Sequence, residues 1–367
     1  MSLRNPYRVL VALLVLVLAP LAGAQPKNVI LLIGDGMGTG HVQAASWYAY
    51  GREGALFMEK LPAKAEVSTT PADGRSIPDS ASGGTALATG VKVNPGVLSQ
   101  AGGKDLPTIL EKYAADGKST GLVTSESLGG ATPAAFSAHT PSRKNYAEIY
   151  RSYYEKNRPN LLLGGGWQQP EEDATKAGYK IVRTRAELFA VDPAKTSHVA
   201  GRFSPASMPV EFDYRIRADG RYDRIPHLSE MAAASLEFLA SNDKGFFLMI
   251  EGGLIDHAAH RNDLVRTIYE TLEFDTTVRE VLRWAAGRND TLVIVTADHE
   301  TGGLAVTKGG RAGELPEVTW STGGHTKSRL PLYAWGVGAE KFTGQIENTD
   351  VPNTILKLSI RRSSGSI

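Results

Sequence analysis

Five short segments of the chain place metal-ligating or nucleophilic side chains next to an apolar run or a glycine-rich turn. Carboxylates and imidazoles bind divalent cations, and a serine hydroxyl becomes a nucleophile when a neighbouring group activates it. Any one of these residues alone is typical of an ordinary turn or helix cap. Together, and in this order, they predict a nucleophile beside more than one metal ion: Asp35; Ser80; Glu251, Asp256 and His260; Asp298 and His299; and His325.

Two groups of these side chains combine nitrogen and oxygen donors. Asp256 and His260 are four residues apart in a predicted helix, so both side chains lie on one face and can bind one ion. With His325 as a third donor they suit zinc, which accepts both kinds of ligand and keeps an open position when it is catalytic. A second site of the same kind would be formed by Asp35, Asp298 and His299.

The other side chains suit magnesium binding and phosphoryl transfer. Asp35 and Glu251 with a hydroxyl group would form an oxygen-only site, which magnesium prefers. Ser80 opens a predicted helix at residues 81–89, and a helix N-terminus favours developing negative charge. Two metal ions about 4 Å apart clamp the attacking and leaving oxygens in phosphoryl transfer. The guanidinium group of Arg143 suits bidentate binding of two phosphate oxygens.

The elements that carry these residues alternate along the chain. Short apolar runs predict buried strands at residues 28–33, 121–124, 161–163, 246–250, 292–296 and 330–335. Helical patterns lie between them, at residues 81–89, 106–116, 145–156, 229–241 and 256–286. This alternation predicts an α/β fold with a largely parallel central sheet and helices on both faces. Such sheets bind ligands beyond the carboxyl ends of the strands, where Asp35, Glu251 and Asp298 follow theirs.

Composition and charge limit the classes of protein to consider. The chain has 367 residues, of which 42% are hydrophobic and 22% are charged, as in a globular protein with a large core. A formal net charge of +1 gives no reason to expect a nucleic-acid-binding surface. The chain has no cysteine, which excludes disulfides and thiolate ligands. We expect one domain over residues 25–360, with a polar insertion at about residues 170–225 and a disordered tail at residues 361–367.

The first 24 residues have the pattern of a signal peptide. Arg4 and Arg8 form a basic start, residues 9–18 are apolar, and Ala22-Gly23-Ala24 is a cleavage site of small residues. The apolar run is shorter than the ~20 residues that a membrane-spanning helix needs. We therefore expect cleavage after Ala24, export to the periplasm or the extracellular space, and no membrane span after cleavage.

The order of these motifs resembles that of the alkaline phosphatases, from about residue 28 to residue 335. The family's nucleophile motif stands here as Asp79-Ser80-Ala81, and its Ala-Thr/Ser-Pro motif as Ala131-Thr132-Pro133. Its Glu-Gly-x-x-Ile-Asp-x-x-x-His run corresponds to residues 251–260, and its Asp-His pair to Asp298-His299. The family's bridging aspartate, phosphate-binding arginine and last zinc ligand correspond to Asp35, Arg143 and His325.

This resemblance implies a role for each side chain. One zinc ion would be held by Asp256, His260 and His325, the other by Asp35, Asp298 and His299, and magnesium by Asp35, Thr132 and Glu251. The implied reaction is hydrolysis of small phosphate monoesters at alkaline pH. Ser80, in contact with metal, would attack phosphorus and form a phosphoserine, and a zinc-bound hydroxide would then release inorganic phosphate. The family is commonly homodimeric, so a homodimer is the oligomer to test.

Gly130 and His257 occupy two further positions of this family pattern. The family usually has Asp or His just before the Ala-Thr/Ser-Pro motif, as an outer partner of the magnesium site, whereas this chain has Gly130. Loss of such a partner typically weakens metal affinity or activity by about 10–100-fold, so we expect the third site to be the weakest. His257 stands where members carry Lys, His or Trp near the phosphate, which implies substrate binding through water and not metal ligation.

Two other kinds of function stay open at the level of the sequence. A sister enzyme would hydrolyse phosphodiesters or sulfate esters. However, Ser80 lacks the following Pro and Arg of sulfatase maturation, and Arg143 with three metal sites favours a phosphate with two free oxygens. The non-enzyme alternative is an exported phosphate- or metal-binding protein without turnover, which Gly130 favours. Rates on monoesters and diesters, before and after chelation, separate the three.

Overall fold

The structure is a computed structural model that describes residues 25–166, 171–216, 220 and 222–359. The predicted signal peptide at residues 1–24 and the predicted tail at residues 361–367 lie outside the described residues. So do residues 167–170, at the start of the predicted insertion.

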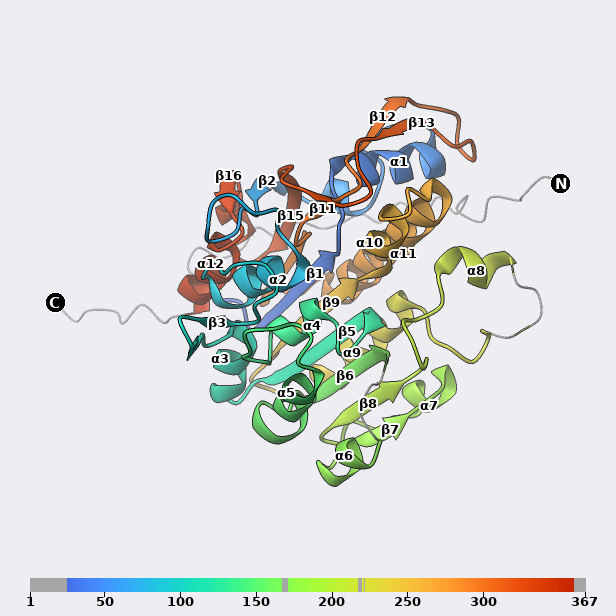
Figure 1. Cartoon of the computed structure of the whole chain (residues 1–367). Coiled ribbons are helices and arrows are strands. Elements are labelled where there is room, and N and C mark those ends of the chain that lie inside the picture. The colour runs from blue at the N-terminus through green and yellow to red at the C-terminus, as the bar shows by residue number, and fades with distance from the viewer. Residues whose placement is uncertain (1–24, 167–170, 217–219, 221, 360–367) are drawn as a thin grey trace.

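A ten-stranded sheet forms the centre of the molecule (Figure 1). Seven neighbouring strands are parallel: β7 (Lys180–Val182), β8 (Val199–Arg202), β6 (Leu161–Gly165), β5 (Ser119–Ser127), β9 (Phe246–Gly252), β1 (Asn28–Gly34) and β10 (Thr291–Thr296). Beyond β10 the direction reverses in β15 (Leu330–Gly336) and again in β2 (Ala63–Ser68), which pairs in parallel with the edge strand β16 (Gly344–Glu347). The predicted α/β class with a largely parallel sheet is confirmed.

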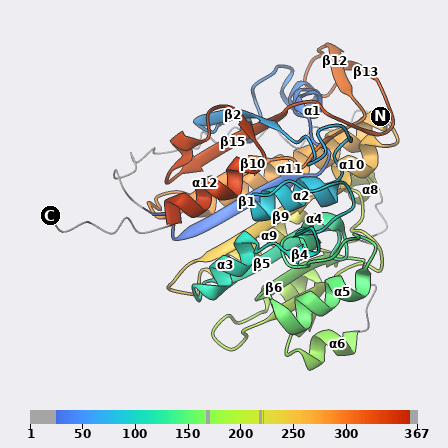
Figure 2. The same cartoon turned by 60° about the vertical axis from the view of Figure 1, so that its left-hand side comes forward.

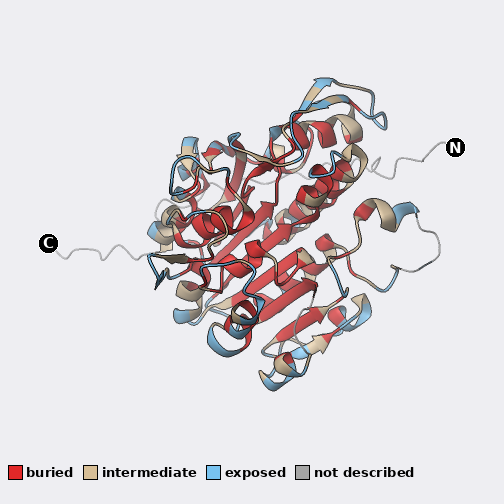
Figure 3. Ribbon diagram, in the orientation of Figure 1, coloured by how far each residue is buried: buried red, intermediate tan, exposed pale blue. Residues whose placement is uncertain are grey.

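The centre of the sheet is apolar on both faces. In β1 every residue is buried, and Leu31 lies between Ile294 of β10 and Met249 of β9. All three side chains are fully buried, and the strands of the sheet's centre are red throughout in Figure 3. Continuous apolar strands are stable only where helices cover both faces, which is why the chain alternates between strands and helices.

Helices cover the two faces in separate layers (Figures 1 and 2). On one face α9 (Leu228–Leu239) and α11 (Leu264–Ala285) pack together, and α1 (Thr39–Tyr50) packs on α11. The other face carries α2 (Ser80–Thr89), α3 (Ile109–Ala115), α4 (Ala131–Ala135) and α12 (Asp350–Ser359). The shorter helices are α5 (Tyr146–Arg151), continued as one π-helical turn at Ser152–Lys156, α6 (Glu171–Lys176), α7 (Arg185–Phe189), α8 (Glu211–Ile216) and α10 (Leu254–Ala259).

Three two-stranded antiparallel sheets and two short helical turns complete the described part. The paired strands are β3 (Gln100–Ala101) with β4 (Lys104–Asp105), β11 (Glu300–Thr301) with β14 (His325–Thr326), and β12 (Leu304–Lys308) with β13 (Glu317–Trp320). The 3-10 turns are Met58–Lys60 and Ala339–Lys341.

The predicted single helix at residues 256–286 is wrong, because the chain breaks between α10 and α11. Asn262 adopts a left-handed backbone with φ of 52°, which ends the first helix. Asp263 then begins the second, since its side chain accepts a hydrogen bond from the Arg266 N–H at 3.1 Å. The break leaves α10 as a short helix after β9 and makes α11 a separate helix.

The region predicted as an insertion at about residues 170–225 continues the central sheet. In its described part, β8 pairs with β6 and β7 pairs with β8, so two short strands extend the parallel edge. Helices α6 and α7 lie around this edge, whereas α8 packs against α11 (Figure 1). Within the described residues, no helix combines the length and the apolar character required to cross a membrane.

Candidate active site and metal centre

The site lies at the carboxyl ends of three neighbouring parallel strands. Asp35 follows β1 directly, and Glu251 is the last residue but one of β9, so that strand runs further than predicted. Asp298 comes two residues after β10. Gly36, with φ of 72°, donates its backbone N–H to Asp298 Oδ1 at 3.2 Å, and a Cβ there would lie 3.0 Å from Asp256. A glycine turn therefore joins the loops after β1 and β10.

One group of predicted ligands gathers around Asp256. The Nε2 atoms of His260 and His325 are 3.0 Å apart and lie 3.3 and 3.5 Å from the two carboxylate oxygens of Asp256. The Nδ1 atoms of the two rings lie 2.7 Å from the Gly323 carbonyl oxygen and 2.9 Å from that of Pro78. Because a carbonyl only accepts, each Nδ1 donates, which leaves Nε2 as the ring atom that faces the carboxylate and that can ligate a metal ion once it has no proton. Ring nitrogens and carboxylate oxygens that converge in this way suit one cation.

A second group is fully enclosed by protein. His299 Nε2 lies 3.3 Å from Asp35 Oδ1 and 3.5 Å from Asp298 Oδ2. These two carboxylate oxygens are buried and have no hydrogen-bond partner. Burial, with repulsion from Asp256, raises the pKa of Asp298 to about 7, and burial lowers the pKa of His299 to about 4. Two partnerless carboxylate oxygens beside an uncharged imidazole are costly unless a cation neutralises them, so this donor set fits a divalent metal ion.

The two groups are in contact with each other. The His299 and His325 rings are stacked with their centroids 3.7 Å apart. Asp256, His299 and His325 also offer ligand atoms within 4.8 Å of one another. The described fold therefore brings the predicted ligands of both zinc ions into one centre.

A third group carries oxygen donors only. The Thr132 hydroxyl, from the first turn of α4, donates to Asp35 Oδ2 at 3.5 Å. Glu251 accepts a hydrogen bond from the Thr124 hydroxyl on Oε2, while its Oε1 is buried and has no partner. Burial, with repulsion from Glu126, raises the pKa of Glu251 to about 8. Carboxylates and a hydroxyl around a partnerless oxygen fit a hard cation such as magnesium.

Ser80 lies at the start of α2 against the second group. Its Oγ is 3.3 Å from His299 Nε2, and its side chain is buried. Asp79 caps the helix by accepting the Ser82 N–H at 3.0 Å. The other Asp79 oxygen accepts a hydrogen bond from Arg143 Nη1 at 3.1 Å. The cap thus fixes the nucleophile candidate and the phosphate-binding candidate relative to each other.

His257 points away from both histidine-containing groups. It lies on α10 with its Nε2 3.2 Å from Glu126 Oε1. Glu126 was not among the predicted site residues, although it offers an oxygen within 4.8 Å of those of Asp35 and Glu251. The sequence carries no motif for Glu126, which lies near the end of β5.

The sequence is similar to those of known proteins over most of its length. The sequence profile of the family described as alkaline phosphatase matches residues 26–169 and 165–316. The chain belongs to the alkaline phosphatase family. Among the relatives of this family, alkaline phosphatase 4 of Bacillus subtilis is 32% identical, over 91% of this chain and 89% of its own length. The streptomycin-6-phosphate phosphatase of Streptomyces griseus is 34% identical, over 94% of each chain.

Solved alkaline phosphatases share the fold over nearly the whole chain. The enzyme from the Antarctic bacterium TAB5 superposes with a TM-score of 0.78 at 28% identity, covering 92% of this chain and 98% of its own. The cold-active enzyme from Shewanella sp. reaches a TM-score of 0.81 at 27% identity, covering 91% and 100%. Membership of the alkaline phosphatase family makes this chain a phosphoric monoester hydrolase.

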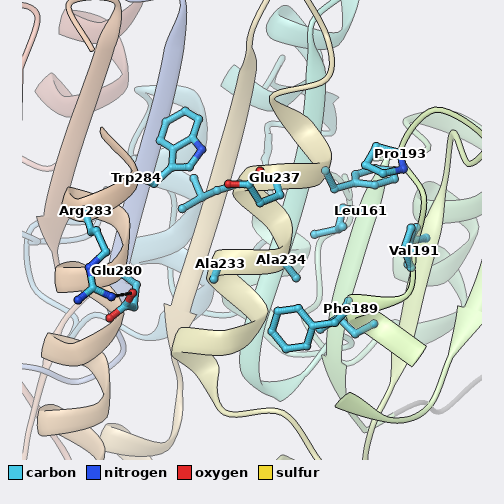
Figure 4. A pocket seen from close by; sticks show the side chains of 14 residues that line it. Leu161, Phe189, Val191, Pro193, Ala233, Ala234, Glu237, Glu280, Arg283 and Trp284 are labelled. Carbon is cyan, nitrogen blue, oxygen red and sulfur yellow. Dashed lines mark hydrogen bonds and ion pairs between the residues drawn. The ribbon is translucent and has the colours of Figure 1, made fainter. Parts of the chain in front are cut away.

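Of two hollows in the described structure, one adjoins the alkaline phosphatase motifs and the other does not. A polar cavity of about 270 Å³ is lined by Glu126, Gly130 and Arg143 and adjoins the site. An apolar pocket of about 460 Å³ lies elsewhere, between α7, α9 and α11, with Phe189 and Trp284 on its wall (Figure 4). None of the predicted ligands lines the apolar pocket, so its size does not indicate the reaction centre.

Proposed function

We propose that the chain hydrolyses phosphate monoesters at alkaline pH through a phosphoserine on Ser80, with two zinc ions and one magnesium ion. One observation carries the proposal. The Ser80 Oγ lies 3.3 Å from His299 Nε2, which in turn lies 3.3 Å from Asp35 Oδ1. The nucleophile is thus in contact with the ligand set of a metal ion, as covalent catalysis by an otherwise weak serine requires.

Each ion has a donor set that suits it. Asp256, His260 and His325 would hold one zinc ion, Asp35, Asp298 and His299 the other, and Asp35, Thr132 and Glu251 the magnesium ion. When bound, the ions would supply positive charge that stabilises a serine alkoxide, activates water and neutralises the phosphoryl group. A solved structure of a variant of the 28% identical TAB5 enzyme is described with magnesium bound, which supports the third site.

The chain's own residues would act in two displacement steps. Ser80 Oγ forms a bond to phosphorus while the bond from phosphorus to the alcohol oxygen breaks, and the alcohol leaves with a proton. A water molecule then attacks phosphorus, the Ser80–phosphorus bond breaks, and inorganic phosphate leaves. Arg143 would bind two phosphoryl oxygens in both steps, held in orientation by Asp79 at 3.1 Å. His257 would bind the phosphoryl group through water.

The raised pKa values of two proposed metal ligands support the preference for alkaline pH. Burial raises the pKa of Asp298 to about 7 and that of Glu251 to about 8. A carboxyl group must lose its proton to bind a metal ion, so metal binding releases protons and strengthens as pH rises. Activity that depends on a full set of ions is therefore expected to increase through this range.

The proposal is tested with the purified, metal-loaded protein. Initial rates are measured on an aryl phosphate, an aryl phosphodiester and an aryl sulfate, before and after chelation. We expect rapid, chelator-sensitive release of phosphate from the monoester, and slower reaction by at least tenfold on the other two. If protein that holds zinc and magnesium hydrolyses none of these substrates, the remaining interpretation is a phosphate- or metal-binding protein without turnover. Faster turnover of the diester or sulfate would instead favour a sister activity.

We also propose that the chain is exported and cleaved after Ala24. The support is the sequence alone, with Arg4 and Arg8 before an apolar run and a small-residue site. Fractionation of an expressing bacterium, with N-terminal sequencing of the product, is the test. A periplasmic or secreted protein that begins at Gln25 is expected, and a cytoplasmic protein that begins at Met1 would contradict the proposal.

A further inference from the structure

Glu126 fills the space that two glycines leave beside the oxygen-only group. It belongs to the carboxyl end of β5. A Cβ added to Gly130 would lie 2.6 Å from Glu126 Oε2 and 2.8 Å from the Ser127 carbonyl oxygen, and one added to Gly253 would lie 2.8 Å from Glu126 Cβ. These distances are shorter than an ordinary contact, so a side chain at position 130 would need the volume that Glu126 occupies and a shift of the Ser127 carbonyl group. Glu126 and an acidic residue at position 130 are therefore alternatives for one place.

The carboxylate in that place is within reach of a shared ion. Asp35, Glu126 and Glu251 each offer an oxygen, and the three oxygens lie within 4.8 Å of one another. An octahedral magnesium ion with ligands at about 2.1 Å separates its oxygens by about 3 to 4 Å, which matches such a group. Independently, Oε1 of the fully buried Glu251 has no hydrogen-bond partner. A third carboxylate beside a partnerless buried one is unfavourable unless a cation lies between them.

We propose that Glu126 is a ligand of the third cation site and supplies, from the end of β5, the acidic side chain that this chain lacks at position 130. The inference rests on the proposed function, because it assumes that magnesium binds beside the two zinc ions. It removes the expected weakness of that site. The absence of a side chain at Gly130 then allows Glu126 to approach the third cation site. Gly130 does not represent a lost partner of that site.

The same carboxylate also contacts the substrate-binding candidate. Glu126 Oε1 lies 3.2 Å from His257 Nε2, whereas Oε2 is the oxygen nearest to Gly130. Glu126 thus joins the third cation site to His257. A simpler alternative is that Glu126 serves only as the ion-pair partner of His257, and the two readings differ in what they predict for magnesium affinity.

The first experiment measures the magnesium dissociation constant by titration calorimetry on zinc-loaded protein. Glu126→Gln keeps the shape of the side chain and removes its charge, so we expect magnesium binding about 10–100-fold weaker than in the wild type. Glu155→Gln, at an exposed glutamate outside the site, is the matched control and should bind as the wild type does. Affinity within twofold of the wild type in Glu126→Gln overturns the inference, as does a wild type that binds no magnesium.

Two further variants separate ligation from pairing with His257. His257→Gln should bind magnesium within twofold of the wild type. If it weakens binding as much as Glu126→Gln does, Glu126 acts through His257 and the inference is wrong. In the double variant Glu126→Ala with Gly130→Asp, the new aspartate has the vacated volume and should restore affinity at least tenfold over Glu126→Ala alone. Because the new Cβ must also displace the Ser127 carbonyl oxygen, the comparison requires a double variant that melts at the same temperature as Glu126→Ala. No restoration in such a protein would contradict the idea that the two positions serve one ion.

Failure of this inference can be told apart from failure of the proposed function. Zinc content and monoester turnover are recorded for every protein. Two zinc equivalents with turnover, combined with unchanged magnesium affinity in Glu126→Gln, overturn the role of Glu126 alone. A wild type without zinc and without turnover overturns the proposed function and the inference with it. Melting curves identify any variant that does not fold.

Discussion

Gly83 in α2 lies directly against the backbone of Asp298. A Cβ added to Gly83 would lie 3.0 Å from the Asp298 Cβ and closer still to its carbonyl oxygen. The helix that begins with Ser80 and the loop that carries Asp298 and His299 therefore pack backbone to backbone. This close approach is what allows Ser80 Oγ to lie 3.3 Å from His299 Nε2.

A methyl group at position 83 should separate the two segments. We expect Gly83→Ala to lower the rate at least tenfold and to lower the free energy of unfolding by about 1–3 kcal/mol, as overpacking does. The sign of the change in the free energy of unfolding is informative, because Gly→Ala within a helix otherwise stabilises by about 0.5–1 kcal/mol. Urea unfolding and initial rates measure both effects. Gly84→Ala is the control, since the atoms nearest to its Cβ would be Ala135 Cβ at 3.2 Å and Thr132 Cα at 3.4 Å, neither as close as the Asp298 backbone is at position 83.

Ser80→Ala should abolish the covalent intermediate. The hydroxyl is the atom that would bond to phosphorus, so we expect the rate to fall at least 100-fold while zinc content stays unchanged. Mass spectrometry of protein quenched during turnover should detect phosphoserine in the wild type and none in the variant. A loss smaller than tenfold would mean that another group attacks phosphorus.

Asp256→Ala and His325→Ala should each remove about one zinc equivalent. Both side chains converge on one point with His260, and loss of one of three protein donors from a metal site leaves too few ligands for tight binding. Elemental analysis after extensive dialysis is the measurement. His198→Ala is the control, because His198 lies outside every group of ligands described above. Unchanged zinc content in either site variant would reject that ligand assignment.

Chelation should make stability fall steeply as pH rises. Burial raises the pKa of Glu251 from 4.5 to about 8, and the hydrogen bond to Asp256 raises the pKa of His260 from 6.5 to about 9. Both groups bind protons more tightly in the folded state, so the metal-free fold loses stability as pH rises through 6.5 to 9. The slope approaches about 1.4 kcal/mol per pH unit for the buried Glu251 within its window, and solvent screening makes the contribution of the exposed His260 smaller.

The metal-loaded protein is the internal control for this prediction. Bound cations would replace the protons, so its free energy of unfolding should depend less on pH over the same range. Urea unfolding at pH 6.5 and pH 9, with and without chelator, gives the comparison. Parallel slopes in the two states would show that these side chains are not neutralised by metal.

Local pattern was enough for much of the fold. Continuous apolar runs identified the central strands β1, β9 and β10, because a buried parallel strand has no polar face to interrupt it. Turn glycines and helix caps located α2, α3, α5 and α9 within a few residues, whereas α1 and α12 were not predicted. The break between α10 and α11 was missed, since Asn262 and Asp263 lie inside a run whose periodicity continues on either side.

The order of the motifs along the chain was enough to name the family and most of the side chains now found together at one edge of the sheet. The distances between these side chains could not be predicted from the order of the motifs. Ser80 and His299 are 219 residues apart in sequence, and only the pairing of β1 with β10 and the packing of α2 bring them within 3.3 Å. Glu126 had no motif of its own. It joins Asp35 and Glu251 because β5 pairs with β9 and because glycines at positions 130 and 253 leave room for its carboxylate, and such space exists only once the strands are side by side.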